Sequence, residues 1–289
     1  MCGTMKAGKQ KISRVEEVLK KCIEEVRLDP ARVNVVSATS RAFVECYLKT
    51  RVDDYIAHFS RLVSEAIYRA FECSKLSEIL TETSKRLDTI ASSLAEAHHI
   101  FDMRLTTVSR LVIDTRNPIF PLEISIAWDP MLNVPFIPSS SLKGRARAYF
   151  ELNNVGVDGL KAYELYGTQS SEGVVLFTDA YPVSCGGKHL VEPDVLTPHY
   201  SEARYAIDEA SASPVPIVFL TVSPEVTFRF LIAIDREVRT ETSVKVVNEI
   251  SKALSAGVGA KTTVGYGRLK VERHSGSQKP STTAQYYRA

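Results

Sequence analysis

Residues 226–271 read VTFRFLIAIDREVRTETSVKVVNEISKALSAGVGAKTTVGYGRLKV, and this stretch decides the fold of the 289-residue chain. It opens with β-branched and aromatic residues from Val226 to Ile234, which predict a strand. Apolar residues at helical spacing then predict a helix from Thr242 to Leu254, with Gly257 just past its end. The residues that run on to 272 read as a second strand. The stretch is therefore a strand–helix–strand unit.

The same order of elements precedes it in residues 122–178. Leu122 to Ala127 (LEISIA) and Val174 to Phe177 (VVLF) read as strands, and Leu142 to Leu152 reads as a helix with the serines 139–141 as possible N-caps. Two such units in series are typical of a ferredoxin-like sheet with both helices on one face. Arg110 to Asp114 (RLVID) reads as a further strand. The predicted fold class is α+β.

The flanking segments differ from this core. Residues 11–100 carry apolar residues at helical spacing, such as Leu76, Leu80 and Leu87, so we expect an N-terminal helical region, 1–100, that packs on a ferredoxin-like domain, 101–274. Residues 181–225 are rich in Pro and turn residues and read as a long inserted loop or hairpin. Residues 275–289 read as a flexible tail.

Composition sets limits on function. The chain is 44% hydrophobic and 24% charged, as in globular proteins, and its net charge of +2 makes any nucleic-acid site a local patch. The N-terminus is polar and no apolar run is long enough for a bilayer, which favours a cytoplasmic protein without a membrane partner. The five cysteines are widely spaced and odd in number, without a CxxC pair, and are expected to be reduced thiols.

The first candidate site is PFIPSSSLKGRARAYF, residues 135–150. Lys143 and Arg147 are four residues apart on one face of the expected helix, and Arg145 lies on another. A helix N-terminus with free N–H groups and adjacent cations can bind phosphate. The alternative is a solvated basic helix on which Leu142, Ala146 and Tyr149 merely pack.

The second candidate site is GVGAKTTVGYGRLKV, residues 257–271. It is no NTPase phosphate loop, because Ala260 precedes Lys261 and a strand follows the loop. The dinucleotide fingerprint also fails, because it requires a strand before the loop and a helix after it. We expect a close approach of glycine backbone to a ligand, with Lys261 and N–H groups holding an anion. The alternative, a helix C-cap followed by a bulged strand, would explain Gly257 but not the other three glycines.

Signals for catalysis are weaker. His199 could be a general base or a polar loop residue, and turn chemistry accounts for an Asp at each of the strand-end positions Asp114, Asp129 and Asp179. Cys185 and His189 are too isolated for a metal site, and no GxSxG or HExxH motif occurs. No cofactor, metal or catalytic residue is predicted.

The two candidate sites together resemble the RAMP superfamily of CRISPR-associated proteins. The resemblance rests on IPSSSLKGRAR at a helix start and GVGAKTTVGYG near the C-terminus, and it extends to LYGTQSSEGVVLFTDAYP, DVLTPHY and SPVPIVFLTV. It covers about residues 104–272, and within the superfamily it is strongest for the type III-B (Cmr) RNA-targeting complexes. Ser139 stands where the family usually has Gly after Ile-Pro. RAMP proteins have ferredoxin-like, RRM-related folds.

The resemblance implies a non-catalytic, RNA-binding subunit of a ribonucleoprotein. Such a subunit would hold the guide (CRISPR) RNA backbone toward its 3′ end and meet target RNA, RAMP backbone subunits and small helical subunits. The residues that would contact RNA are Ser140, Lys143, Gly144, Arg145, Arg147, Gly257, Gly259, Lys261, Thr262, Gly265, Tyr266 and Arg268. The 181–225 segment would contact the guide–target duplex or the next subunit. Two alternatives are a RAMP endoribonuclease that uses His199 or a strand-end Asp, and an assembly scaffold without RNA contact.

Overall fold

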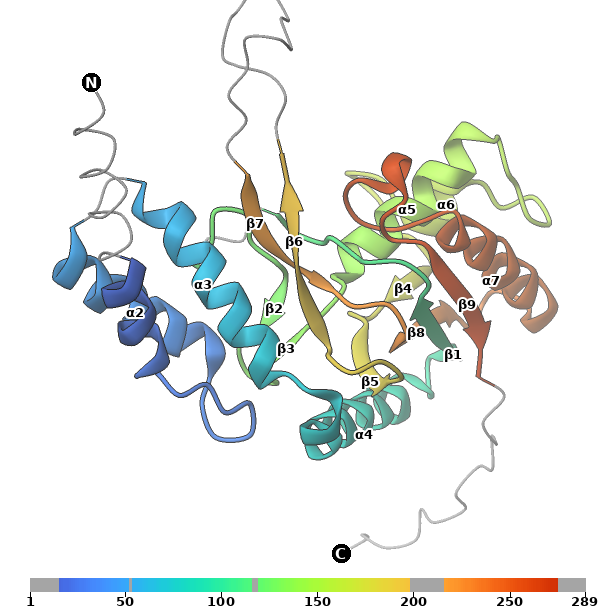
Figure 1. Cartoon of the computed structure of the whole chain (residues 1–289). Helices are drawn as coiled ribbons and strands as arrows, with labels where there is room; N and C mark the ends of the chain where they lie inside the picture. The colour runs from blue at the N-terminus through green and yellow to red at the C-terminus, as the bar shows by residue number, and fades with distance from the viewer. Residues whose placement is uncertain (1–15, 52–53, 116–118, 198–215, 275–289) are drawn as a thin grey trace, which may run out of the picture.

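The computed structural model of the chain describes residues 16–51, 54–115, 119–197 and 216–274 (Figure 1). Residues 16–24 are helical. The named helices are α2 (Val35–Thr50), α3 (Tyr55–Ala70), η1 (Cys73–Lys75), α4 (Ser77–Leu94), α5 (Ser139–Leu152), α6 (Ala162–Tyr166), α7 (Thr240–Ser255) and η2 (Thr262–Val264). The strands are β1 (His98–Thr107), β2 (Trp128–Asp129), β3 (Val134–Pro135), β4 (Val175–Phe177), β5 (Tyr181–Cys185), β6 (Val191–Leu196), β7 (Ile217–Val222), β8 (Val226–Asp235) and β9 (Leu269–Arg273).

The main sheet has the ferredoxin-like order. Its strands lie as β4-β8-β1-β9, all antiparallel to their neighbours, and β5 also pairs with β8. Along the chain the core elements follow as β1, α5, β4, β8, α7 and β9, which is two strand–helix–strand units. The predicted α+β, ferredoxin-like fold class is confirmed, and so are strands β4, β8 and β9 and helices α5 and α7.

The first strand of the first unit is not the predicted strand 122–127. It is β1, in which Phe101, Met103 and Leu105 are buried and alternate with less buried residues. The predicted strands 110–114 and 122–127 are wrong, because both segments cross the core in irregular conformation. Two isolated bridges, Leu111 to Val222 and Val112 to Ala260, satisfy part of the backbone of the first segment.

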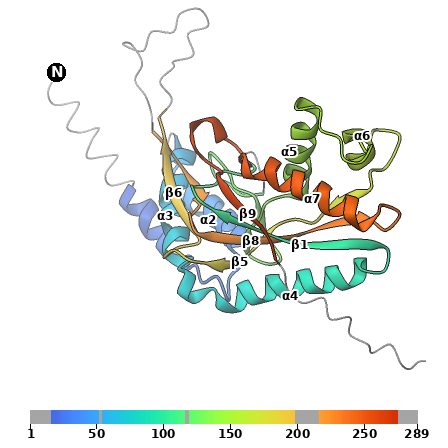
Figure 2. The ribbon, with the colours of Figure 1, turned by 90° about the vertical axis from the view of Figure 1, so that its right-hand side faces the viewer.

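Helices cover both faces of the sheet. Figure 2 shows α5 and α7 on one face and α4 along the other. A two-layer ferredoxin-like sheet would leave that second face open, and here it is buried by part of the N-terminal helical region. Strand β8 is accordingly buried along nearly its whole length, with Phe228 and Phe230 turned to one face and Arg229 and Leu231 to the other.

The inserted segment folds as a hairpin in its described part. Strands β6 and β7 pair from Val191–Val222 to Leu196–Ile217, and α3 packs against both of them. Residues 198–215, which join them, lie outside the described residues. The predicted start of the insertion at 181 is too early, because β5 belongs to the main sheet.

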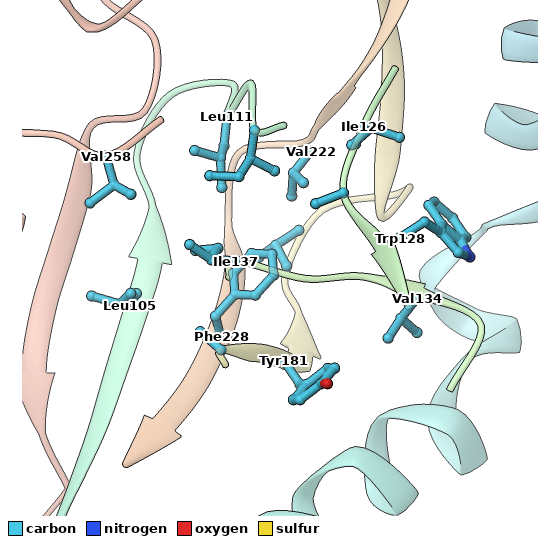
Figure 3. Close-up of a cluster of buried hydrophobic side chains, with 14 of the residues drawn as sticks. Leu105, Leu111, Ile126, Trp128, Val134, Ile137, Tyr181, Val222, Phe228 and Val258 are labelled. Atoms are coloured by element: carbon cyan, nitrogen blue, oxygen red, sulfur yellow. The ribbon is translucent and has the colours of Figure 1, made fainter. Parts of the chain in front are cut away.

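The core continues from the sheet toward the N-terminal helices through the segment that contains β2 and β3. Figure 3 shows Leu105 and Phe228 of the sheet in one cluster with Ile126, Trp128 and Ile137 of that segment. Trp128 also contacts Phe71, just after α3, with ring centroids 4.9 Å apart. The helical region and the ferredoxin-like domain therefore share one hydrophobic core.

Four of the five cysteines are paired, so the prediction of reduced thiols is wrong for these four. Cys22 pairs with Cys46 and Cys73 with Cys185, at Cα–Cα distances of 5.9 and 5.7 Å. Sequence spacing missed both pairs because residues 24 and 112 positions apart are brought together only by the tertiary fold. Within the described ranges, no helix combines the length and apolar character that crossing a membrane requires.

Candidate nucleic-acid interface

Helix α5 presents the first group of cations, but its N-terminus is capped differently from the prediction. The serines 139–141 lie inside the helix, Pro138 is the N-cap, and no side chain of the cap residue caps it. Instead, the carboxylate of Asp179 accepts a hydrogen bond of 2.6 Å from the backbone amide of Ser139. One of the amides expected to face a phosphate is therefore already satisfied by a negative charge. Ser139 begins the helix without a positive φ, so the glycine usual in the family is not needed here.

Two of the three basic side chains of α5 are held by the protein itself. Arg147 donates to Glu151 at 2.7 Å and to the carbonyl oxygen of Gly167 at 3.3 Å. Arg145 donates to the carbonyl oxygen of Ala253 in α7 at 3.2 Å. Lys143 is half-buried and has no ion pair with any described residue.

The glycine-rich loop after α7 owes most of its glycines to its own fold. A side chain at Gly259 (φ 90°) would overlap the carbonyl oxygen of Val112, and one at Gly267 (φ 64°) would overlap that of Val258. Gly257 (φ 107°) terminates α7 in a left-handed conformation that favours glycine. The close approach of backbone that the sequence predicted is thus to the protein itself at two positions, while Gly265 (φ 100°) has open space around it.

Lys261 lies at the turn of this loop. Its backbone is left-handed (φ 59°, ψ 27°) and precedes η2. The backbone amides of Lys261, Thr262 and Thr263 donate to no group in the described parts of the chain. Its ammonium group lies 5.0 Å from the centroid of the Phe219 ring and 5.7 Å from that of Tyr266. A cation over two rings beside free amides can hold an anion.

The loop is tied to the β6–β7 hairpin by a small polar cluster. Tyr266 donates its hydroxyl proton to Asp194 of β6 at 2.5 Å, and this hydrogen bond raises the pKa of Tyr266. Arg110 pairs with Glu192 and, at 3.2 Å, with Asp194, and Glu192 raises the pKa of the guanidinium. These bonds therefore join the loop and the segment around Arg110 to the hairpin.

The two groups of candidate residues lie on neighbouring elements. Helix α5 packs on α7, whose C-terminus leads into the loop, and the Arg145–Ala253 hydrogen bond joins them (Figures 1 and 2). Ser140 and Gly144 are exposed on α5, and Arg268 is exposed at the end of the loop. Thr262, by contrast, packs on Gly257, so part of its side chain serves the loop.

Among the weaker candidates, Asp129 and Asp179 have structural roles. Asp129 accepts hydrogen bonds from the amides of Met131 and Leu132 and from the hydroxyl of Tyr181, while Asp179 caps α5. Asp114 has a positive φ of 52° in an irregular segment. His199 lies outside the described residues. No cluster of three or more His, Cys, Asp or Glu that could hold a metal occurs in the described ranges.

Sequence reasoning missed the roles of three residues, Asp179, Arg110 and Asp194, and of one segment, 167–173. The sequence indicates Asp179 as a strand-end turn residue or a possible catalytic acid, whereas the structure shows that it caps α5 through the amide of Ser139. Arg110 and Asp194 join the hairpin to the loop across 84 residues of sequence, and spacing carries no signal for such a pair. Segment 167–173 was noted for its family resemblance, but its packing beside Lys143 was not foreseen.

Comparison with known proteins agrees with this architecture. The profile described as RAMP superfamily matches residues 104–270. The CRISPR system CMR subunit Cmr6 of Saccharolobus solfataricus is 33% identical over 224 residues, which cover 77% of this chain and 74% of that protein. Cmr6 of Pyrococcus furiosus is 40% identical over 117 residues, 36% of this chain and 33% of that protein.

A solved structure gives the same result. A chain of the cryo-EM structure of the Type III-B Cmr-beta complex bound to cognate target RNA superposes with a TM-score of 0.70 and 29% identity. The match covers 89% of this chain and 98% of that chain, so it includes the N-terminal helices as well as the ferredoxin-like domain. The chain therefore belongs to the RAMP superfamily and, within it, to the Cmr6 family.

Proposed function

We propose that this protein is a non-catalytic, RNA-binding subunit of a type III-B CRISPR (Cmr) effector complex. In this role it holds the sugar-phosphate backbone of the guide RNA toward its 3′ end. Its neighbours are RAMP backbone subunits and small helical subunits, and target RNA pairs with the guide. The similarity to Cmr6 proteins and to a chain of a Cmr complex bound to target RNA supports this assignment.

The observation that carries the proposal is that two lysines of this region lack a carboxylate partner among the described residues. Lys143 and Lys261 are half-buried, lie on neighbouring elements, and have no carboxylate partner in the part of the chain that the structure describes. Most other cations of the region are engaged: Arg147 with Glu151, Arg110 with two acids, and Arg145 with a backbone oxygen. A lysine left without an acid in such surroundings is suited to neutralise a phosphate.

The way in which such a complex recognises RNA agrees with a site made of cations and backbone amides. Sequence is read by base pairing between guide and target, so the protein needs only to hold backbone and shape. Cations and backbone amides are sufficient for that task. The β6–β7 hairpin, tied to the loop through Asp194, is then positioned to meet the duplex or the next subunit.

The binding proposal is tested by substitution in the assembled complex. Lys143→Ala and Lys261→Ala should each weaken guide RNA binding without sequence dependence. Each should also reduce the slope of log K against log salt by about 0.7 to 1, the value for one lost phosphate contact. The matched control is Lys85→Ala, a lysine of α4 on the opposite face of the sheet. Crosslinking and salt slopes that equal those of the wild-type complex would contradict the proposal and favour a scaffold.

The non-catalytic part of the proposal has its own test. Asp129 and Asp179 hold backbone amides, so their loss should reduce stability rather than chemistry. Complexes that carry His199→Ala, Asp114→Asn, Asp129→Asn or Asp179→Asn should cleave target RNA at the wild-type rate, with and without divalent metal. A cleavage event lost with one of these substitutions in a complex that still assembles would favour the ribonuclease.

A further inference from the structure

A polar hollow of about 570 Å³ lies beside Lys143. It is lined by Lys143 of α5, by Tyr166 at the end of α6, by segment 167–173 and by Leu176 of β4. The segment reads GTQSSEG, and residues 168–172 are exposed. Helices α5 and α6 pack together on the same side of the sheet as α7 (Figure 1). The hollow therefore lies on the same face of the sheet as the basic side chains of α5.

The segment that forms the wall of the hollow has a defined conformation. Gly167 has a φ of 82°, and a side chain at Gly173 would overlap the backbone of Leu165, Tyr166 and Gly167. The amide of Thr168 donates to the carbonyl oxygen of Ser171 at 2.8 Å, which closes the turn. Because the turn is closed by backbone, the hydroxyl and amide side chains of residues 168–171 project from a fixed frame.

The same helix that carries Lys143 also anchors this wall. Arg147, one turn farther along α5, donates to the carbonyl oxygen of Gly167. Lys143, Ser170 and Ser171 thereby line one space. The hydroxyls of the two serines also form weak hydrogen bonds within the segment, to the Thr168 hydroxyl and to the carbonyl oxygen of Glu172. A group that binds there meets a cation on one side and neutral donors and acceptors on the other.

Tyr166 is a buried residue beside the hollow, and its ring packs against Phe150 and Phe177. Tyr166 is 3% exposed and lines the hollow, and its buried hydroxyl has no hydrogen-bond partner among the described residues. Burial raises the pKa of Tyr166, so the hydroxyl keeps its proton and remains a donor. Because this oxygen is enclosed by protein atoms, a group in the hollow contacts Tyr166 without reaching its hydroxyl.

We propose that this hollow takes one ribonucleotide of the guide strand, with its phosphate on Lys143 and its ribose 2′-hydroxyl on the side chains of segment 168–171. The inference rests on the proposed function and adds to it the means by which RNA is distinguished from DNA. A cation alone binds either backbone, whereas neutral groups that both donate and accept match the 2′-hydroxyl. Glu172 at the rim disfavours a second phosphate and can accept a hydrogen bond from a base or sugar.

The test is a scan of single 2′-deoxy substitutions along the guide RNA in the assembled complex. Wild type should lose about 3- to 10-fold in guide affinity at the one position seated in the hollow, the effect of one lost hydrogen bond. In Ser170→Ala/Ser171→Ala, the penalty at that position should disappear while penalties at other positions remain. Both serines are exposed and their backbone bonds are kept, so the variant should fold. The matched control is Ser92→Ala/Ser93→Ala, two exposed serines of α4.

The outcomes separate this inference from the proposed function. Lys143→Ala should weaken ribose and 2′-deoxy guides by the same factor. If the lysine variants weaken binding but the loop variant leaves every 2′-deoxy penalty unchanged, the hollow is no ribose site and the inference is wrong. If the lysine variants also have no effect, the RNA-binding function itself is wrong.

Discussion

At the scale of single residues, the glycines of the 257–267 loop have separable roles. Gly267 has a left-handed backbone and no room for a side chain, because a Cβ would overlap the carbonyl oxygen of Val258. Gly265 is also left-handed but has open space around it. Gly267→Ala should therefore lower the free energy of unfolding by about 3 kcal/mol, from conformational strain and steric overlap together.

Gly265→Ala is the matched control, since it carries the conformational strain without the overlap. Gly265→Ala should lower the free energy of unfolding by about 1 kcal/mol. Urea denaturation of the purified chain gives both values. Equal losses for the two variants would mean that the loop shifts to admit a methyl group at 267, and that the fit of its backbone to residue 258 is looser than the structure indicates.

At the scale of elements, the strand–helix–strand order was readable because it depends on local patterns. The run of β-branched and aromatic residues along β8 and the helical spacing along α7 were sufficient to define the second unit. The run 122–127 was mistaken for a strand because buried irregular segments are as apolar as strands, and Ile126 and Ala127 are fully buried without pairing in a ladder. β1 was overlooked although Phe101, Met103 and Leu105 alternate clearly.

The candidate site was less predictable than the fold. The sequence identified the cations of α5 and the loop, but not which of them the protein itself engages. Arg147 and Arg145 are bound by a carboxylate and by a carbonyl oxygen, and only tertiary packing decides that. The structure also accounts for Gly259 and Gly267 through contacts with residues 112 and 258, which spacing could not indicate.

The contact between α4 and the sheet leads to a prediction at the same scale. Arg229 of β8 is buried and binds Asp102 of β1 at 2.8 Å, Asp88 of α4 at 2.7 Å and the carbonyl oxygen of Ser84 at 3.1 Å. Arg229→Leu should lower the free energy of unfolding by about 3 kcal/mol, because it leaves the partly buried carboxylate of Asp102 without a cation. Thermal or urea unfolding of the isolated chain measures the loss.

Two further variants show whether the loss comes from the unpaired charge. Asp88→Asn should lower the free energy of unfolding by less than about 1 kcal/mol, since the Asp88 side chain is 63% exposed. Arg229→Leu combined with Asp102→Leu should recover most of the stability, because an apolar pair removes the uncompensated charge. A double variant as unstable as the single one would mean that Arg229 acts mainly through α4.

At the scale of the whole molecule, the two disulfides join segments that are not adjacent along the chain. Cys22–Cys46 closes a short loop within the N-terminal helical region, whereas Cys73–Cys185 joins that region to β5 of the main sheet across 112 residues. Disulfides persist in oxidising compartments and also in intracellular proteins of hyperthermophiles. Their effect on stability follows from the loops that they close.

The longer crosslink should stabilise the folded chain more. Loop-closure entropy gives upper values of about 5 kcal/mol for Cys73–Cys185 and about 3.5 kcal/mol for Cys22–Cys46. Cys73→Ser/Cys185→Ser should therefore lower Tm more than Cys22→Ser/Cys46→Ser, and a reducing agent should lower Tm in wild type but not in the quadruple variant. Under denaturing, non-reducing conditions, thiol titration should find one free thiol per chain, that of Cys2. Five free thiols would instead mean that the cysteines are reduced as their spacing predicted, and that the shared hydrophobic core alone joins the helical region to the sheet.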